Sequence, residues 1–193
     1  MFNQAEIHRL ASSRDVTVRI KTAIHLCNHF IDLQDKMQAW NDLHRLTSDT
    51  NSWVRWGAAY ALRSAFSHVP DKIQAWDDLI RLTSDIDCGV GARSVDALGS
   101  VFWHVPDKIQ AWADLHRLTS DIHSYVRRGA ADALGSCYSQ ISEEYKKQAC
   151  DDLHRLTHDE EPYIRIAANH SLGRVSIYKA CQAKGDNSVR KEL

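Results

Sequence analysis

The string DLHRLTSD at residues 114–121 brings together the residue types that a hydrolase would use. A histidine can act as a general base, a serine or threonine as a nucleophile, and an aspartate can orient the histidine. The same string occupies residues 42–49, and close copies occupy residues 78–85 and 152–159, after a weaker copy from Glu6. The copies start 36 residues apart, with one interval of 38. Because an enzyme needs one such constellation and not five, this periodicity indicates a repeat architecture.

The histidines of these strings are too far apart in the predicted repeats to bind one metal ion together. The equivalent positions are His8, His44, His116 and His154. Neighbouring repeats stack roughly 10 Å apart, whereas zinc ligands lie only about 2.0–2.1 Å from the metal. Two of these histidines follow Trp40 and Trp112 by four residues, so we expect them to pack or hydrogen-bond beside those indoles. We predict no metal ion and no cofactor, and the motifs GxSxG, GxGxxG and the P-loop are also missing from the sequence.

The overall charge disfavours a dedicated nucleic-acid-binding protein. The 193 residues include 24 basic and 25 acidic side chains, for a formal net charge of −1, and nucleic-acid binders usually carry a basic excess. The five cysteines form no CxxC pair, which is typical of reduced thiols. The N-terminus has no apolar signal region, and no apolar run is long enough to cross a membrane. We therefore expect a cytoplasmic protein without a membrane segment.

Each repeat unit contains two segments with helical periodicity. In residues 71–85, Trp76 and Leu79 fall on one side of a helix. In residues 52–66, a stripe of small and apolar residues lets a second helix approach closely. The string VPD at residues 69–71 supplies a proline that ends one helix and an aspartate that can cap the next.

The sequence thus predicts an all-α, right-handed α-solenoid of five antiparallel helix pairs. The expected helices are 3–12 and 16–31, 35–48 and 52–67, 71–84 and 88–103, 107–120 and 124–140, and 143–157 and 161–178. They form one domain, residues 1–180, with units at about 1–33, 34–69, 70–105, 106–141 and 142–180. We expect the tail, residues 181–193, to be frayed, the natural chain to continue beyond Leu193, and the open solenoid ends to favour self-association.

The second helices carry a shared motif, V-R-x-x-A-A-x-A-L. Its copies are VRWGAAYAL from Val54, VRRGAADAL from Val126, IRIAANHSL from Ile164 and the looser VRIKTAIHL from Val18. This motif resembles the HEAT repeat, in particular the short prokaryotic, phycobilisome-lyase-like variety, over residues 3–178. The tetratricopeptide repeat has a similar period of 34 residues, but its glycine in the first helix is missing here. The resemblance implies an armadillo-like helical fold and does not specify a function.

The resemblance also implies a ladder between turn aspartates and helix arginines. The aspartates would be Asp49, Asp85, Asp121 and Asp159, and the arginines Arg19, Arg55, Arg127 and Arg165. Charge-assisted bonds of this kind would satisfy backbone groups at the helix ends. The third unit has Gly91 in the arginine position, and Arg93 is a candidate to replace it from another angle.

The outward side of the second helices is the expected binding surface, because in HEAT solenoids these helices line the concave face. Trp56, Tyr60 and Arg63 lie there together, a composition typical of interaction hot spots. The other expected positions are Ile20, Ile24, Asp96, Arg128, Asp132 and His170, with glycines at 99, 135 and 173. An alternative is that Trp56 packs on Ile20 or on its own neighbours.

We therefore expect a non-catalytic protein-interaction module or scaffold that binds another protein or peptide. Two alternatives follow from family resemblance. A HEAT-like alkylated-base DNA glycosylase would use residues of the type of Trp56, Arg63 and Asp96, although the charge balance opposes it. A phycobilin-lyase-like role is suggested by the repeat subtype alone. HEAT-type diiron hydroxylases bind metal through His-Glu pairs, and no His-Glu dipeptide occurs here.

Overall fold

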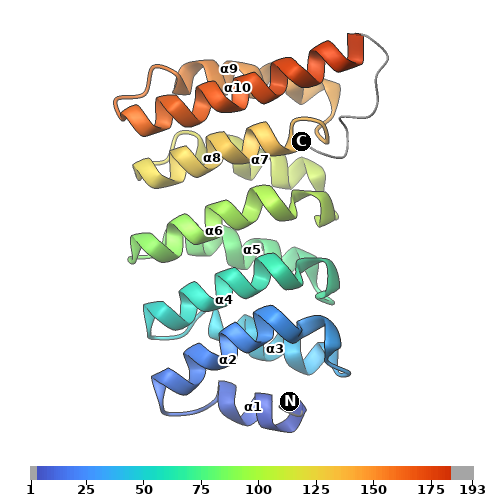
Figure 1. The fold of residues 1–193 in the computed structure, drawn as a ribbon, viewed down its shortest axis with the longest axis vertical. Coiled ribbons are helices and arrows are strands. Elements are labelled where there is room, and N and C mark those ends of the chain that lie inside the picture. The colour runs from blue at the N-terminus through green and yellow to red at the C-terminus, as the bar shows by residue number, and fades with distance from the viewer. Residues whose placement is uncertain (1–3, 184–193) are drawn as a thin grey trace. The chain divides into compact units, whose positions relative to one another are not determined.

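The computed structural model describes residues 4–183, and every regular element in this range is helical. Ten α-helices and three short 3₁₀ helices follow one another in this range (Figure 1). None of the described helices is both long and apolar enough to span a membrane. The all-α prediction is confirmed.

Contacts between Cα atoms divide the chain into two compact units, Met1–Pro106 and Asp107–Leu193. The first unit contains α1 (Gln4–Ala11), α2 (Val16–His29), α3 (Lys36–Leu46), α4 (Ser52–Ala65), α5 (Lys72–Thr83) and α6 (Cys88–Val101). The second contains α7 (Lys108–Leu118), α8 (Ser124–Cys137), α9 (Glu143–Leu156) and α10 (Pro162–Ala183). Each pair of consecutive helices is one hairpin, so the units hold three hairpins and two hairpins of the described chain.

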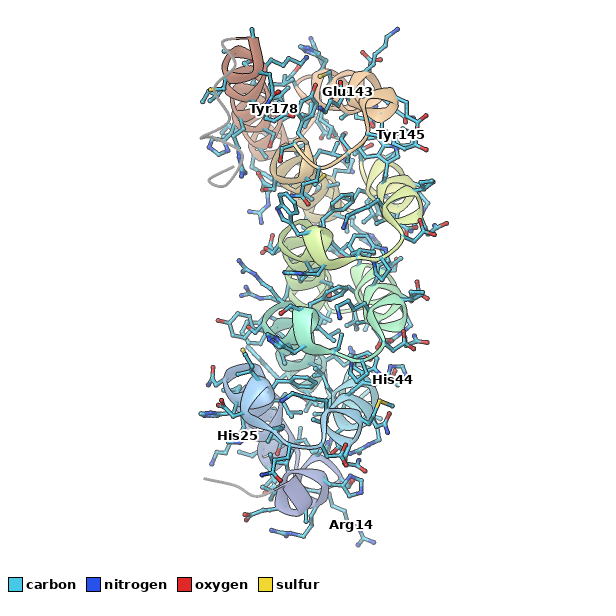
Figure 2. The ribbon with its side chains drawn as sticks, turned by 90° about the vertical axis from the view of Figure 1, so that its right-hand side faces the viewer. Arg14, His25, His44, Glu143, Tyr145 and Tyr178 are labelled. Atoms are coloured by element: carbon cyan, nitrogen blue, oxygen red, sulfur yellow. The ribbon has the colours of Figure 1, made fainter. Side chains whose placement is uncertain are left out.

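Within each unit the hairpins stack as they do in an α-solenoid. The second helices α2, α4 and α6 contact one another in the first unit, and α8 contacts α10 in the second (Figure 1). The first helices of the hairpins form a separate layer, which is apparent in the view along the helices (Figure 2). The second helices therefore have the layer of first helices on one side, and the side opposite that layer is open.

Polar caps begin the first helices. Asp35, Asp71 and Asp107 precede α3, α5 and α7, and each side chain accepts a backbone N–H from inside the helix at 2.9 Å. Such a cap satisfies an amide that has no partner within the helix. The aspartate of the VPD string therefore has the capping role that was predicted.

The second helices of the first unit end earlier than predicted. The expected helices to residues 31, 67 and 103 change into 3₁₀ helices, η1 (Phe30–Asp32), η2 (Phe66–His68) and η3 (Phe102–His104). The first residue of each is a phenylalanine that is at most 2% exposed. The tighter turn points this ring into the core before the chain turns into the next hairpin.

Three tryptophans at equivalent positions of the repeats lie in the core of the hairpins. Trp40, Trp76 and Trp112 are 4%, 2% and 3% exposed. Trp76 meets Phe102 edge-on at 6.3 Å, and Trp112 stacks on Tyr145 at 5.6 Å. These rings fill the space between the two helix layers, where large aromatic side chains contribute much buried area.

Two predictions at the ends of the second helices were wrong. The last helix, α10, continues to Ala183, so residues 181–183 of the expected tail are helical, and residues 184–193 lie outside the described range. Gly99 and Gly135 were placed on the outward side but are buried. At Gly135 the reason is a close approach of helices, since a Cβ there would lie 2.5 Å from Ser171 Oγ on α10.

This approach gives a matched pair of glycine substitutions. Gly135→Ala should lower the free energy of unfolding by about 1–3 kcal/mol, because the added methyl would also lie 3.0 Å from Ser171 Cα. Gly173→Ala, at the equivalent position of α10, has nothing within 4 Å and should raise it by about 0.5–1 kcal/mol through helix propensity. Urea unfolding followed by circular dichroism measures both, and equal effects would contradict the close packing.

Candidate functional site

Arginine–aspartate pairs join successive hairpins within each unit. Arg55 on α4 donates from Nε to Asp85 Oδ2 at 2.6 Å and from Nη2 to Asp85 Oδ1 at 2.7 Å. Arg19 pairs with Asp49 in the same way, at 2.6 and 2.9 Å, and Arg127 with Asp159, at 2.7 and 3.0 Å. All six side chains are at most 14% exposed. This two-point geometry makes the pairs both strong and directional.

The same arginines and aspartates also hold the turn inside each hairpin. Arg55 Nη1 donates to the carbonyl of Asp49 at 2.8 Å, and Asp49 Oδ1 accepts the N–H of Asn51 at 2.9 Å. Burial alone would raise the pKa of Asp49, but the bonds from Arg19 and from the Asn51 amide hold this pKa below its usual range. The carboxylate is therefore ionised and fully occupied with structural partners.

Other ladder positions lack this pairing. Asp121 accepts from the N–H of His123 at 2.9 Å and from its Nδ1 at 3.0 Å. Arg165 donates to the carbonyls of Asp159 and Glu160, and to no carboxylate in residues 4–183. Gly91 has no side chain with which to pair. At these three positions the regular Arg–Asp pairing is missing from the described residues.

A second set of pairs, which sequence reasoning missed, joins the first helices. His8 Nδ1 donates to Asp42 Oδ1 at 2.9 Å, and His44 Nδ1 to Asp78 Oδ2 at 2.6 Å. His116 pairs with Asp152 at 2.6 Å in the second unit. Figure 2 shows His44 on the side of the first helices and His25 on the side of the second helices.

An arginine completes each of these pairs. Arg81 donates to Asp78 Oδ1 at 3.2 Å and reaches back to Thr47 Oγ1 of the preceding hairpin at 2.7 Å. Arg155 contacts Asp152 and Thr119 in the same manner. In the copy of DLHRLTSD at residues 42–49, the first Asp, the His, the Arg and the last Asp all bond to neighbouring hairpins, and in the copy at residues 114–121 the His does so. The string that looked most like an active site is structural.

The outward side of α4 carries an aromatic surface. Trp56 stacks on Tyr60 with ring centres 5.9 Å apart, and Trp53 meets Trp56 edge-on at 6.5 Å. Trp53 is 66% exposed and Tyr60 is 37% exposed, while Trp56 is half-buried. The rings follow one another at helical spacing, so a single helix presents all three together. We call Trp53, Trp56, Tyr60 and Arg93 the aromatic platform.

Arg93 of α6 completes this platform and does not replace the missing ladder arginine. Its guanidinium carbon lies 4.8 Å from the ring centre of Trp56 and 5.2 Å from that of Tyr60. Two residues of an α-helix turn by about 200°, so Arg93 faces away from the side where position 91 points. Within residues 4–183, Arg93 donates to no acceptor, and its Nε is buried without one.

A small cavity borders the platform at the start of α4 and α6. It has a volume of about 110 Å³ and is lined by Ser52, Trp53, Trp56, Asp87 and Gly89. The Asp87 carboxylate already accepts the N–H groups of Gly89 and Val90 at 2.9 and 3.3 Å. The lack of a side chain at Gly89 keeps the indole wall accessible, since a Cβ there would lie 4.0 Å from Trp56 Cδ1.

The remaining predicted surface residues lie in both units. In the first unit Ile24 is 43% exposed, Ile20 and Asp96 are half-buried, and Arg63 is exposed and has no hydrogen bond or ion pair within the described chain. In the second unit Arg128 and Asp132 are half-buried and His170 is exposed. Each unit therefore contributes its own residues, and the aromatic rings belong to the first.

The second unit holds a cluster of lysines and tyrosines between α9 and α10, the helices that Glu143 and Tyr178 mark in Figure 2. Lys146 Nζ lies 4.9 Å from the Tyr178 ring centre and donates to Glu143 at 2.5 Å. Lys179 donates to Cys150 Sγ at 3.3 Å. Cys137, the last residue of α8, is fully buried, and this burial raises the pKa of its thiol to about 12, whereas the lysines above have partners on α9 and α10. These groups satisfy one another, so the cluster fastens α10 to α9.

The residues that sequence reasoning missed had weak signals. Asp42, Asp78 and Asp152 recur one residue before a core leucine, which marks them as part of the repeat but does not reveal their burial. Arg93 stands in the irregular string CGVGARSVDAL, and this irregularity was the signal for it. No three His, Cys, Asp or Glu side chains in the described range gather as they would around a metal ion.

Known structures with similar folds are helical repeat proteins. A designed armadillo repeat protein in complex with the peptide (KR)4 has a TM-score of 0.64 and 18% identity, covering 89% of this chain and 81% of its own. The protein Cex1p has a TM-score of 0.75 and 12% identity, covering 92% of this chain and 36% of its own. A structure of microtubule polymerases with TOG domain arrays has a TM-score of 0.61 and 14% identity, covering 87% and 39%.

These similarities establish an armadillo/HEAT-type repeat fold. At such low identities they extend to the fold alone. No protein-family model matches the chain, and no curated protein sequence matches it significantly. The function therefore has to be argued from the side chains described above.

The Arg–Asp pairs lead to a stability prediction. Arg55→Met should lower the free energy of unfolding by about 3–5 kcal/mol, because Asp85 would remain partly buried without its partner. Arg165→Met removes bonds to two carbonyls and no carboxylate partner, and should cost about 1.5 kcal/mol. Urea unfolding of both variants provides the comparison. Equal losses would show that carboxylate pairing is not what stabilises the ladder.

The same pairs predict a loss of stability in acid. The pKa values of Asp49, Asp85 and Asp159 are lowered in the folded protein, so their contribution is complete above the unfolded Asp value of about 3.9. It is lost as the pH falls further, through the folded-state values. Asp85→Asn should therefore be less stable at pH 7 and lose less stability below pH 4. The exposed Asp151→Asn is the control, and a wild-type acid profile in Asp85→Asn would contradict the prediction.

Proposed function

We propose that this protein is a non-catalytic interaction module that binds an extended peptide or a partner protein along the open side of its second helices. The aromatic platform is the observation that carries the proposal. Large aromatic rings beside an arginine dominate binding energy at protein interfaces. Here they are exposed on α4, although the core already contains other tryptophans that are almost fully buried.

The architecture supports this function. The ladder pairs and the His–Asp pairs stabilise the stack from inside, so the open side of the second helices is not needed to hold the hairpins together. A designed armadillo repeat protein of similar fold is in complex with the peptide (KR)4, and this supports peptide binding by a stack of this kind. The platform offers flat apolar rings, and the cavity of about 110 Å³ beside them can receive one side chain of a partner.

The dominance of structural roles among the polar residues argues against catalysis. His44 and His116 bond to aspartates of the next hairpin, and the buried Cys137 stays a thiol. Nucleophilic catalysis would need a nucleophile and a base in contact and open to substrate. We also propose that the repeats of this chain are HEAT repeats of the short prokaryotic type.

A peptide-display selection tests this function. Wild-type protein should enrich peptides from an unbiased nonapeptide library, and the double substitution Trp56→Ala with Tyr60→Ala should weaken the selected peptides about 30-fold or more, equivalent to about 2 kcal/mol. Fluorescence anisotropy measures the affinities. Trp103→Ala, which removes a 59% exposed tryptophan elsewhere in the first unit, should leave them unchanged.

Circular dichroism melts confirm that each variant is folded. The proposal fails if the double variant binds the selected peptides as tightly as wild type does. It also fails if Trp103→Ala weakens them to the same extent.

A further inference from the structure

We propose that Arg93 binds an isolated carboxylate of the partner peptide, so that the aromatic platform recognises an acidic side chain. This inference rests on the proposed function and specifies the chemistry of its partner. The inference begins from the hydrogen bonding of Arg93, which differs from that of the three ladder arginines that pair with an aspartate. Arg19, Arg55 and Arg127 each donate to a carboxylate and to backbone carbonyls.

Arg93 has a fixed position but no acceptor. Its guanidinium carbon lies over two rings, 4.8 Å from the centre of Trp56 and 5.2 Å from that of Tyr60. The Nε atom is buried without a hydrogen-bond partner in residues 4–183. A buried polar group without a partner is rare in native proteins, because it loses water and gains nothing in return.

An arginine in this state is prepared for a carboxylate. The planar guanidinium presents a fork of donors that matches the two oxygens of a carboxylate. Stacking on the rings removes the side-chain freedom that binding would otherwise have to restrict. A lysine would offer a point charge without the fork or the stacking, so the residue type is part of the argument.

The surrounding charges limit the partner to one isolated acidic group. Asp87 caps the start of α6, this helix also carries Asp96 after Arg93 in the sequence, and the chain as a whole has a formal net charge of −1. A polyanion such as a nucleic acid would meet these carboxylates and be repelled. A peptide with a single Glu or Asp between uncharged or basic residues would not. The occupant is therefore a peptide segment, with its carboxylate at Arg93 and an adjacent side chain against the rings.

The test uses three display libraries of nonapeptides that differ at the central residue. That residue is fixed as Glu, Gln or Lys, and the other positions exclude Asp and Glu. Peptides selected on wild-type protein are synthesised with Glu and with Gln at the centre, and their affinities are measured by fluorescence anisotropy. Wild type should bind the Glu form at least tenfold more tightly than the Gln form.

The variants assign this preference to one side chain. In Arg93→Gln the ratio of Glu to Gln affinities should fall to about one, and Arg93→Lys should recover only part of it. Arg9→Gln, which removes an arginine that is 73% exposed on α1, should keep the full ratio. Circular dichroism melts of all variants confirm that the folded state is retained.

The opposite outcomes are distinct. A ratio near one on wild type, a ratio that survives Arg93→Gln, or a failure to select any Glu-centred peptide overturns the inference. So does a nine-nucleotide oligothymidine that binds more tightly than the Glu peptides. If the selected peptides prefer Gln or Lys but still need Trp56 and Tyr60, the carboxylate is wrong and the proposed function stands. If they bind without these rings, the proposed function itself is wrong.

Discussion

The two-point pairing of an arginine with the turn aspartate of the next hairpin is the constraint on which each unit depends. A hairpin of two short helices cannot bury its apolar face alone and has to stack on a neighbour. Stacking partly buries the turn, whose amides and carbonyls then need partners. Arg55 satisfies a carbonyl of its own turn with one nitrogen and fixes Asp85 with two others. One side chain thus sets both the turn and the register of stacking.

The His–Asp pairs repeat this principle between the first helices. Because Asp78 is only 2% exposed, its charge has to be matched from the preceding and the same hairpin, by His44 and Arg81. Polar bonds therefore specify how hairpins align, while Trp76 and its equivalents supply the buried area. The consequence for function is that neither the ladder nor the core uses the open side of α4. Substitutions on this open side therefore leave the ladder pairs and the buried core in place.

Most of the fold could be predicted from the sequence, and less of the candidate site could. The period and the shared motif predicted ten helices in five pairs. The burial of Asp78 could not be predicted, because its histidine partner is 34 residues away and the pair forms only on stacking. Gly135 appeared outward on a single helix, and only the approach of α10 buries it. Trp56 and Tyr60 were expected on the outward side, whereas the direction of Arg93 depended on the neighbouring helix.

The third hairpin departs from the pattern twice. Ile80 stands in the position of the histidine, and Gly91 stands in the position of the ladder arginine. The other four hairpins have a histidine and an arginine at these two positions, and this hairpin has neither. The division between the two units follows directly after it, at Pro106. Departures from local consistency are expected where function competes with stability. In this hairpin a positive charge stands at residue 93 instead of residue 91. Residue 93 lies on a side of α6 where its Nε finds no hydrogen-bond acceptor in the described chain. Leaving such a group unpaired costs stability, and under the proposal above a partner's carboxylate at this guanidinium offsets part of that cost.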